Sequence, residues 1–137
     1  MRLFLILIVS LYILSCEKNL DPLGRVVFLE TSKDIYELSD SVNIYLINES
    51  NESVFSHGYF YISKKIGNEW SEFQRTVPYM NEPTREYKNR KNLVWTFTFQ
   101  DTGQYKYRMN FSWDYEGKVK DNLGLLYTKT IKIKIGT

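Results

Sequence analysis

The stretch of residues 104–113 alternates strictly between polar and apolar side chains. Its apolar positions are Tyr105, Tyr107, Met109, Phe111 and Trp113, and Gln, Lys, Arg, Asn and Ser occupy the positions between them. Because successive side chains of a β-strand point to opposite faces, this period of two predicts a strand with one buried and one exposed face. A helix would distribute the same apolar residues around its whole circumference. The chain is therefore expected to build a sheet that covers a hydrophobic core.

The remainder of the chain shows the same preference for strands. It contains 11 Tyr and 8 Phe but not one Ala, and aromatic residues suit a pleated surface whereas Ala is the best helix former. Six further segments alternate or are rich in β-forming residues: 25–31, 41–48, 59–66, 69–75, 93–99 and 131–135. Gly67-Asn68 has the composition of a tight hairpin turn. Seven short strands predict an all-β sandwich, with a seven-stranded barrel as the alternative.

Several details of these segments are expected from the same patterns. Residues 76–91 contain two prolines and form the longest predicted irregular connection, while 48–58 and 113–122 are shorter connections. Lys132 and Lys134 in the last strand discourage pairing between sheet edges. In the segment 93–99 one face is expected to carry Leu93, Trp95, Phe97 and Phe99.

The N-terminus has the composition of a signal peptide. Arg2 supplies one positive charge, and the 12 residues from Leu3 to Leu14 are almost all apolar. At about 1.5 Å per residue this run spans about 18 Å, well short of the roughly 30 Å bilayer core. An apolar run of this length is typical of a secretory signal.

The four residues Ile13-Leu14-Ser15-Cys16 that end this run resemble the lipobox of bacterial lipoproteins. The resemblance implies cleavage between Ser15 and Cys16, a diacylglyceryl group on the Cys16 thiol, and an acyl chain such as palmitate on the new N-terminus. It therefore implies a membrane as one partner of the protein. An ordinary secretory signal that happens to precede a Cys is the alternative.

Three segments follow from this N-terminus: a lipoprotein signal peptide over 1–15, a polar tether over 16–24 and a β-domain over 25–137. The expected location is the bacterial cell envelope. Glu17, rather than Asp, follows the Cys, and in one Gram-negative sorting scheme this favours the outer membrane over the inner membrane.

The segment Asp101-Thr102-Gly103-Gln104-Tyr105 resembles the D-x-G-x-Y signature of immunoglobulin folds. The resemblance implies an immunoglobulin-like β-sandwich of about seven antiparallel strands. It makes Tyr105 a tyrosine corner whose hydroxyl bonds back to the backbone, with Asp101 and Gly103 shaping the turn. The two core cysteines of antibody domains are absent, and Tyr107 stands where the second would be.

A second pattern runs from Tyr36 through Ser39-Asp40 into an alternating strand that ends at Asn48. Together with Trp70 and Gly103-x-Tyr105, it resembles bacterial immunoglobulin-like domains, including those related to intracellular proteinase inhibitors. This resemblance spans about residues 26–135.

Most catalytic and nucleic-acid-binding classes lack support in the sequence. The net charge of +2, or +1 without Arg2, comes with no dense Lys/Arg cluster, so no nucleic acid is expected as a partner. A single Cys permits neither an internal disulfide nor a thiolate zinc cluster. His57 is the only imidazole and stands in no catalytic motif. We therefore expect that the protein is not an enzyme and that it binds neither a cofactor nor a metal.

A few polar and large apolar residues are candidate binding sites. Asp114, Glu116 and Asp121 could ligate Ca²⁺, but a charged hairpin tip is the favoured interpretation. The sequons that begin at Asn48 and Asn51 are interpreted as a polar turn rather than as glycosylation sites. Exposed large apolar residues, three aromatic and one Met, could bind a sugar or a protein, although packing at the core edge is favoured; these candidates are Trp113, Tyr115, Tyr79 and Met80.

The expected function is therefore a membrane-anchored, non-catalytic binding or structural module whose partner is an unknown protein or glycan. Two alternatives remain: a protease inhibitor that uses residues 76–91, and a carbohydrate-binding module that uses Trp113 or Tyr115. A hydrolase is the least supported alternative.

Overall fold

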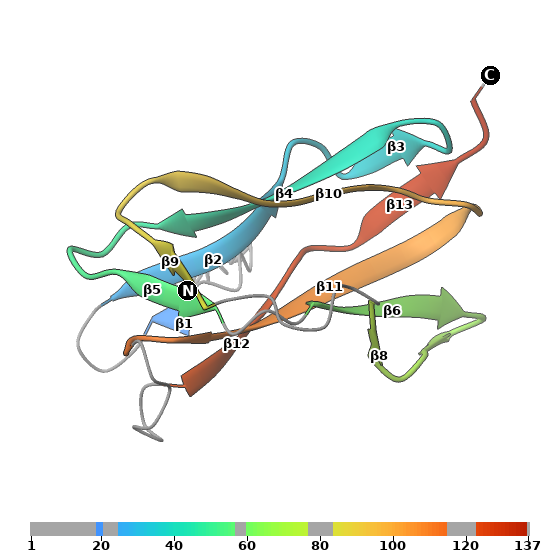
Figure 1. Cartoon of the computed structure of the whole chain (residues 1–137). Helices are drawn as coiled ribbons and strands as arrows, with labels where there is room; N and C mark the ends of the chain where they lie inside the picture. The colour runs from blue at the N-terminus through green and yellow to red at the C-terminus, as the bar shows by residue number, and fades with distance from the viewer. Residues whose placement is uncertain (1–18, 21–24, 57–59, 77–83, 115–122, 137) are drawn as a thin grey trace, which may run out of the picture.

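The computed structural model describes residues 19–20, 25–56, 60–76, 84–114 and 123–136 (Figure 1). All regular structure in these ranges is β-strand, and they contain no helix long and apolar enough to cross a membrane. The predicted signal peptide and Cys16 lie outside the described residues.

The first sheet has four strands in the order β1-β2-β4-β10, and all its pairs are antiparallel. Their bounds are β1 (Asn19–Leu20), β2 (Val26–Thr31), β4 (Ser41–Asn48) and β10 (Lys91–Thr98). In β4 the side chains of Val42, Ile44 and Leu46 are completely buried. The alternation predicted for this strand is confirmed.

The second sheet is organised around the longest strand, β11 (Gly103–Ser112). One side of β11 pairs with β6 (Phe60–Ile66) and β5 (Val54–Ser56), and the other side pairs with β13 (Ile131–Lys134) and then β12 (Leu123–Tyr127). Short strands extend the sheet: β3 (Ile35–Glu37) on β13, β9 (Arg85–Tyr87) on β5, and β7 (Glu69–Trp70) and β8 (Gln74–Arg75) on β6.

The core lies between the two sheets. Every apolar position predicted to face inward on β11 is buried, as are Ile131 and Ile133 of β13. Aromatic rings join β10 and the residue after it, Phe99, to the second sheet. The centroid distances are 5.3 Å for Phe60–Trp95, 4.5 Å for Phe97–Tyr107 and 4.2 Å for Phe99–Tyr105. The predicted all-β sandwich is therefore confirmed, and Figure 1 shows β4 and β10 running above β11 and β6.

The prediction for segment 93–99 was wrong at its first residue. A β-bulge shifts the register of β10 between Leu93 and Trp95, so that Val94 becomes buried while Leu93 is 55% exposed. One inserted residue exchanges the two faces of a strand, because side chains alternate with a period of two. Trp95, Phe97 and Phe99 still face the core.

Several strand assignments also differ from the sequence prediction. The expected return strand 69–75 is divided into the two-residue strands β7 and β8, and β9 interrupts the expected irregular connection 76–91. Strands β1, β3, β5 and β12 were not predicted, and β1 lies within the segment 16–24 that was expected to be a polar tether. One pair is parallel, because β3 lies along β13 in the same direction, whereas only antiparallel strands were expected.

Strand β12 is held against β11 by a ring that packs on a glycine. Gly124 is the register partner of Phe111, and a Cβ atom at Gly124 would lie 2.3 Å from Cε1 of that ring. Phe111 is only 5% exposed and meets Trp113 edge to face at 5.8 Å. The ring therefore has little space into which it could move.

We expect Gly124→Ala to lower the free energy of unfolding by about 1–3 kcal/mol, the usual cost of overpacking a core. Urea unfolding of wild type and variant measures this difference. Phe111→Leu should recover part of the loss in the Gly124→Ala background, because the smaller side chain leaves room for the methyl group. An unchanged midpoint in Gly124→Ala would mean that the ring does not occupy this position.

Candidate functional site

The outer face of the second sheet carries a row of polar side chains from β11. Since the odd-numbered residues of this strand fill the core, Gln104, Lys106, Arg108 and Asn110 point away from it. Residues that are directly paired across strands lie on the same face of the sheet. Arg108 pairs with Tyr61 of β6 and with Tyr127 of β12, so its side chain is flanked by aromatic residues.

Arg108 is held by two aromatic rings. Its guanidinium carbon lies 4.2 Å from the ring centroid of Tyr61 and 5.1 Å from that of Phe73. Phe73 is in turn placed by Tyr127, with ring centroids 5.7 Å apart in an edge-to-face arrangement. Each cation–π contact contributes about 0.5–1 kcal/mol at an exposed site. The guanidinium plane is therefore fixed before any partner arrives.

Lys106 makes a similar contact one step along the strand. Its Nζ atom lies 4.9 Å from the ring centroid of Trp70, which is 36% exposed in β7. We call this cluster the basic–aromatic face and define it by six residues: Tyr61, Trp70, Phe73, Lys106, Arg108 and Tyr127.

The charges of the basic–aromatic face are not balanced by the part of the chain that the structure describes. Elsewhere cations meet carboxylates, with N–O distances of 2.8 Å for Arg25–Glu52, 2.6 Å for Lys33–Asp40 and 3.4 Å for Lys91–Glu30. Neither Lys106 nor Arg108 forms an ion pair with a described residue, and Nε of Arg108 is buried without a hydrogen-bond partner among them. Such a face is suited to bind anionic groups.

The D-x-G-x-Y residues lie at the turn that enters β11. The Tyr105 hydroxyl lies 3.2 Å from the carbonyl oxygen of Asp101 and 2.6 Å from its Oδ1 atom. The Lys64 ammonium also bonds this carboxylate, and Lys64 together with Tyr105 lowers the pKa of Asp101. Gly103 has φ +152°, and a Cβ there would lie 3.0 Å from Cε of Lys64. These residues connect the turn to β6, so we assign them a structural rather than a catalytic role.

Asn48 is a structural residue as well. It is 1% exposed, and its amide nitrogen donates to the carbonyl oxygens of Glu52 at 2.7 Å and Tyr87 at 3.1 Å. Its Oδ1 atom accepts from the backbone N–H and the hydroxyl of Ser50. The interpretation of this sequon as a polar turn is confirmed, and the bond to Tyr87 adds a long-range contact that local sequence did not indicate.

Trp113 lies at the edge of the core, as the favoured interpretation expected. It is 9% exposed, and the guanidinium of Arg25 lies 4.2 Å from its ring centroid. The ring therefore does not offer the open surface that stacking on a sugar requires.

Other candidates are only partly described. Asp114 follows β11, and its carbonyl oxygen accepts a hydrogen bond from Ser112 at 2.6 Å. The remaining candidates lie outside the described residues: His57, Tyr79, Met80, Tyr115, Glu116 and Asp121. Among the residues with described positions, no three His, Cys, Asp or Glu side chains gather closely enough to hold a metal ion.

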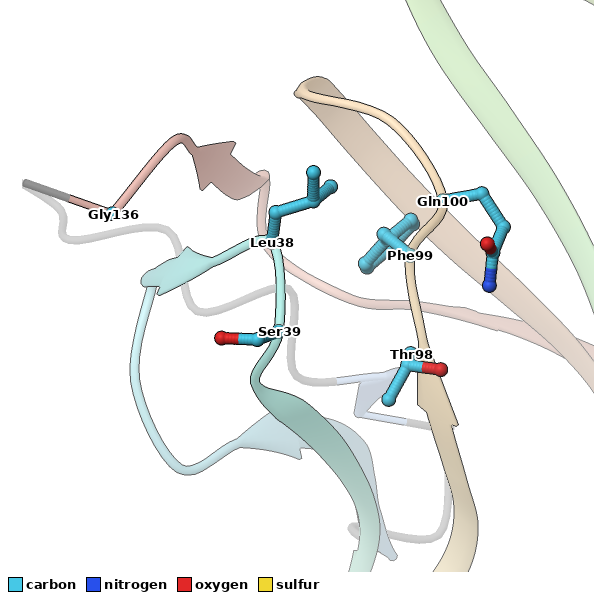
Figure 2. Close-up of a pocket in the computed structure, with 6 residues that line it drawn as sticks. All are labelled: Leu38, Ser39, Thr98, Phe99, Gln100 and Gly136. Carbon is cyan, nitrogen blue, oxygen red and sulfur yellow. The ribbon is translucent and has the colours of Figure 1, made fainter.

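A hollow at one end of the sandwich has a different character. Figure 2 shows it between the turn after β3, the end of β10 and the C-terminal segment, with Leu38 and Phe99 on opposite sides. Its lining contains no ionisable side chain and consists of Leu38, Ser39, Thr98, Phe99, Gln100 and Gly136. It offers neither acid–base chemistry nor a charge for recognition, so the basic–aromatic face remains the candidate site.

Comparisons with protein-family models and with curated proteins find no match for this chain. The function is therefore inferred from the positions of its own side chains.

Proposed function

We propose that this protein is a non-catalytic binding module of the bacterial cell envelope, anchored by lipid on Cys16, whose basic–aromatic face contacts a partner. The observation that carries the proposal is the position of Arg108, held between Tyr61 and Phe73 without a carboxylate among the described residues. A charge that is positioned in advance and left without a counter-ion favours binding, because little conformational entropy remains to be lost.

The anchor is supported by the apolar run of residues 3–14 and by the lipobox resemblance that ends at Cys16. Each buried methylene contributes about 0.8 kcal/mol, so two or three acyl chains hold a protein durably whereas one does not. Residues 16–24, of which Asn19–Leu20 form β1 beside β2, connect this anchor to the first sheet. The outer membrane is the favoured location because Glu17 follows the lipidated residue.

The hydrogen bonds of the buried serine hydroxyl groups also favour a binding role over a catalytic role. Ser63 donates to the carbonyl oxygen of Ser71 at 2.6 Å, and Ser50 and Ser112 form comparable bonds to Asn48 and to the backbone. These serines are occupied in holding strands and turns together. A catalytic serine would need an adjacent general base instead.

Cross-linking in intact cells tests the binding role. We expect the full-length wild-type protein to form a reproducible cross-linked species with an envelope component, and Arg108→Ala to reduce its yield about tenfold, since one charged contact is worth roughly 1.4 kcal/mol or more. Arg90→Ala is the matched control, because Arg90 is an exposed arginine whose Nε bonds Asn92 at 3.3 Å, away from the basic–aromatic face. Equal yields for wild type and Arg108→Ala, with both variants folded, would reject this face as the binding site.

A further inference from the structure

The cations on the outer face of the second sheet form a continuous band. Lys132 is the register partner of Gln104, and Lys106 and Arg108 follow at alternate positions of β11. Lys134 continues the same alternation at the other end, on β13. Along one strand each step of two residues is about 6.8 Å, and the step from Lys106 to Lys132 also crosses to the neighbouring strand, about 4.8 Å away. Measured along the strand direction, the four cations extend over about 20 Å.

The band lacks carboxylate partners within the described chain. None of its four cations forms an ion pair there; Glu37 lies beside Lys134 in register, but its carboxylate is turned toward Gly136. Glu69 and Glu72 are exposed next to Trp70 and do not pair with Lys106 or Arg108 either. The band therefore presents two cations on β11 and two on the neighbouring β13 to a partner.

The arrangement of the aromatic rings favours an anionic ligand over a neutral sugar. Sugar recognition uses open ring faces, whereas Tyr61, Phe73 and Trp70 each have a cation over one face. The rings instead fix the orientation of the cations. A planar guanidinium held in this way matches a carboxylate through two parallel N–H···O bonds.

Along the strand direction, the spacing of the cations in the band matches the repeat of an extended polypeptide. In an extended chain, acidic residues at alternate positions project from one face with the same repeat of about 6.8 Å. Exposed Trp70 offers apolar contact to neighbouring side chains of such a segment. We infer that the partner of the basic–aromatic face is an acidic polypeptide segment, bound in extended form, with Asp or Glu at alternate positions. This inference rests on the proposed function.

Fluorescence anisotropy with the full-length protein in nonionic detergent tests the inference. The probes are three peptides of equal length: Glu at alternate positions, the same composition with the Glu residues contiguous, and Gln in place of every Glu. We expect the alternating peptide to bind most tightly and the Gln peptide not to bind. Affinity should fall as salt is raised, because exposed charges are screened.

Variants locate the site. Arg108→Ala should weaken binding of the alternating peptide about tenfold, and Arg108→Lys should not restore it fully because the ammonium lacks the planar fork. Arg90→Ala should bind as the wild type does. Urea unfolding of each variant establishes that it is folded, so a loss of binding can be assigned to the contact.

The alternative outcomes separate this inference from the proposed function. Tighter binding of the polysaccharide polygalacturonate than of any peptide, or equal binding of the alternating and contiguous peptides, would overturn the inference. The inference would also be overturned if no peptide binds while cross-linking in cells still depends on Arg108. In that case the proposed function stands with a different ligand. Loss of both the peptide binding and the Arg108-dependent cross-link would reject both.

Discussion

Replacement of Cys16 by Ser is expected to abolish lipid attachment completely. The serine hydroxyl cannot form the thioether that carries the diacylglyceryl group, so the protein should either remain uncleaved or appear in the soluble fraction. The wild-type protein should sediment with membranes and be released by detergent. Cell fractionation, followed by mass spectrometry of the intact protein, measures both location and acylation.

Ser15→Ala is the matched control for this experiment. It keeps a small residue at the predicted cleavage position, so processing and membrane attachment should continue. A Cys16→Ser protein that is still cleaved before residue 16 and still bound to membranes would contradict the lipoprotein assignment. It would also leave the binding module without the anchor that we propose.

Asn48→Ala is expected to lower the free energy of unfolding by about 3 kcal/mol. The substitution leaves the carbonyl oxygen of Tyr87 and the N–H and hydroxyl of Ser50 without the bonds that Asn48 makes. A buried polar group without a partner costs about 1–3 kcal/mol, and several groups are affected here. The urea midpoint should therefore fall strongly, and the connection between β4 and β5 should lose its protection from hydrogen exchange.

Asn51→Ala provides the comparison, because Asn51 begins the second sequon of the same connection but is exposed. Surface substitutions of this kind usually change stability by less than about 0.5 kcal/mol. Equal midpoints for the two variants would show that Asn48 does not hold the connection together. A large loss in Asn48→Ala alone would assign the effect to its buried bonds.

The inward-facing residues of β4 and β11 could be predicted from the sequence alone. The alternation in β4 and β11 is a local property of an extended backbone, so it could be predicted without knowing the neighbouring strands. The hairpin turn could also be predicted locally, from the composition of Gly67-Asn68. Gly67 has the positive φ of 61° that such a turn requires.

Other strands could not be predicted, because they depend on their neighbours. β12 has the sequence Leu-Gly-Leu-Leu-Tyr, in which polar and apolar residues do not alternate. Its Gly124 leaves room for the ring of Phe111 on β11. The bulge at Val94 is visible only as a shift of β10 against β4. Both features arise from packing between segments that are distant in the chain.

Part of the candidate site could likewise be predicted from the sequence, and part could not. The alternation of β11 already placed Lys106 and Arg108 on the exposed face of their strand. The position of the Phe73 ring beside the Arg108 guanidinium and the extension of the same row by Lys132 of β13 depend instead on how distant strands assemble. The physical reason is that a period of two assigns a side chain to a face, whereas strand order and register assign its neighbours on that face.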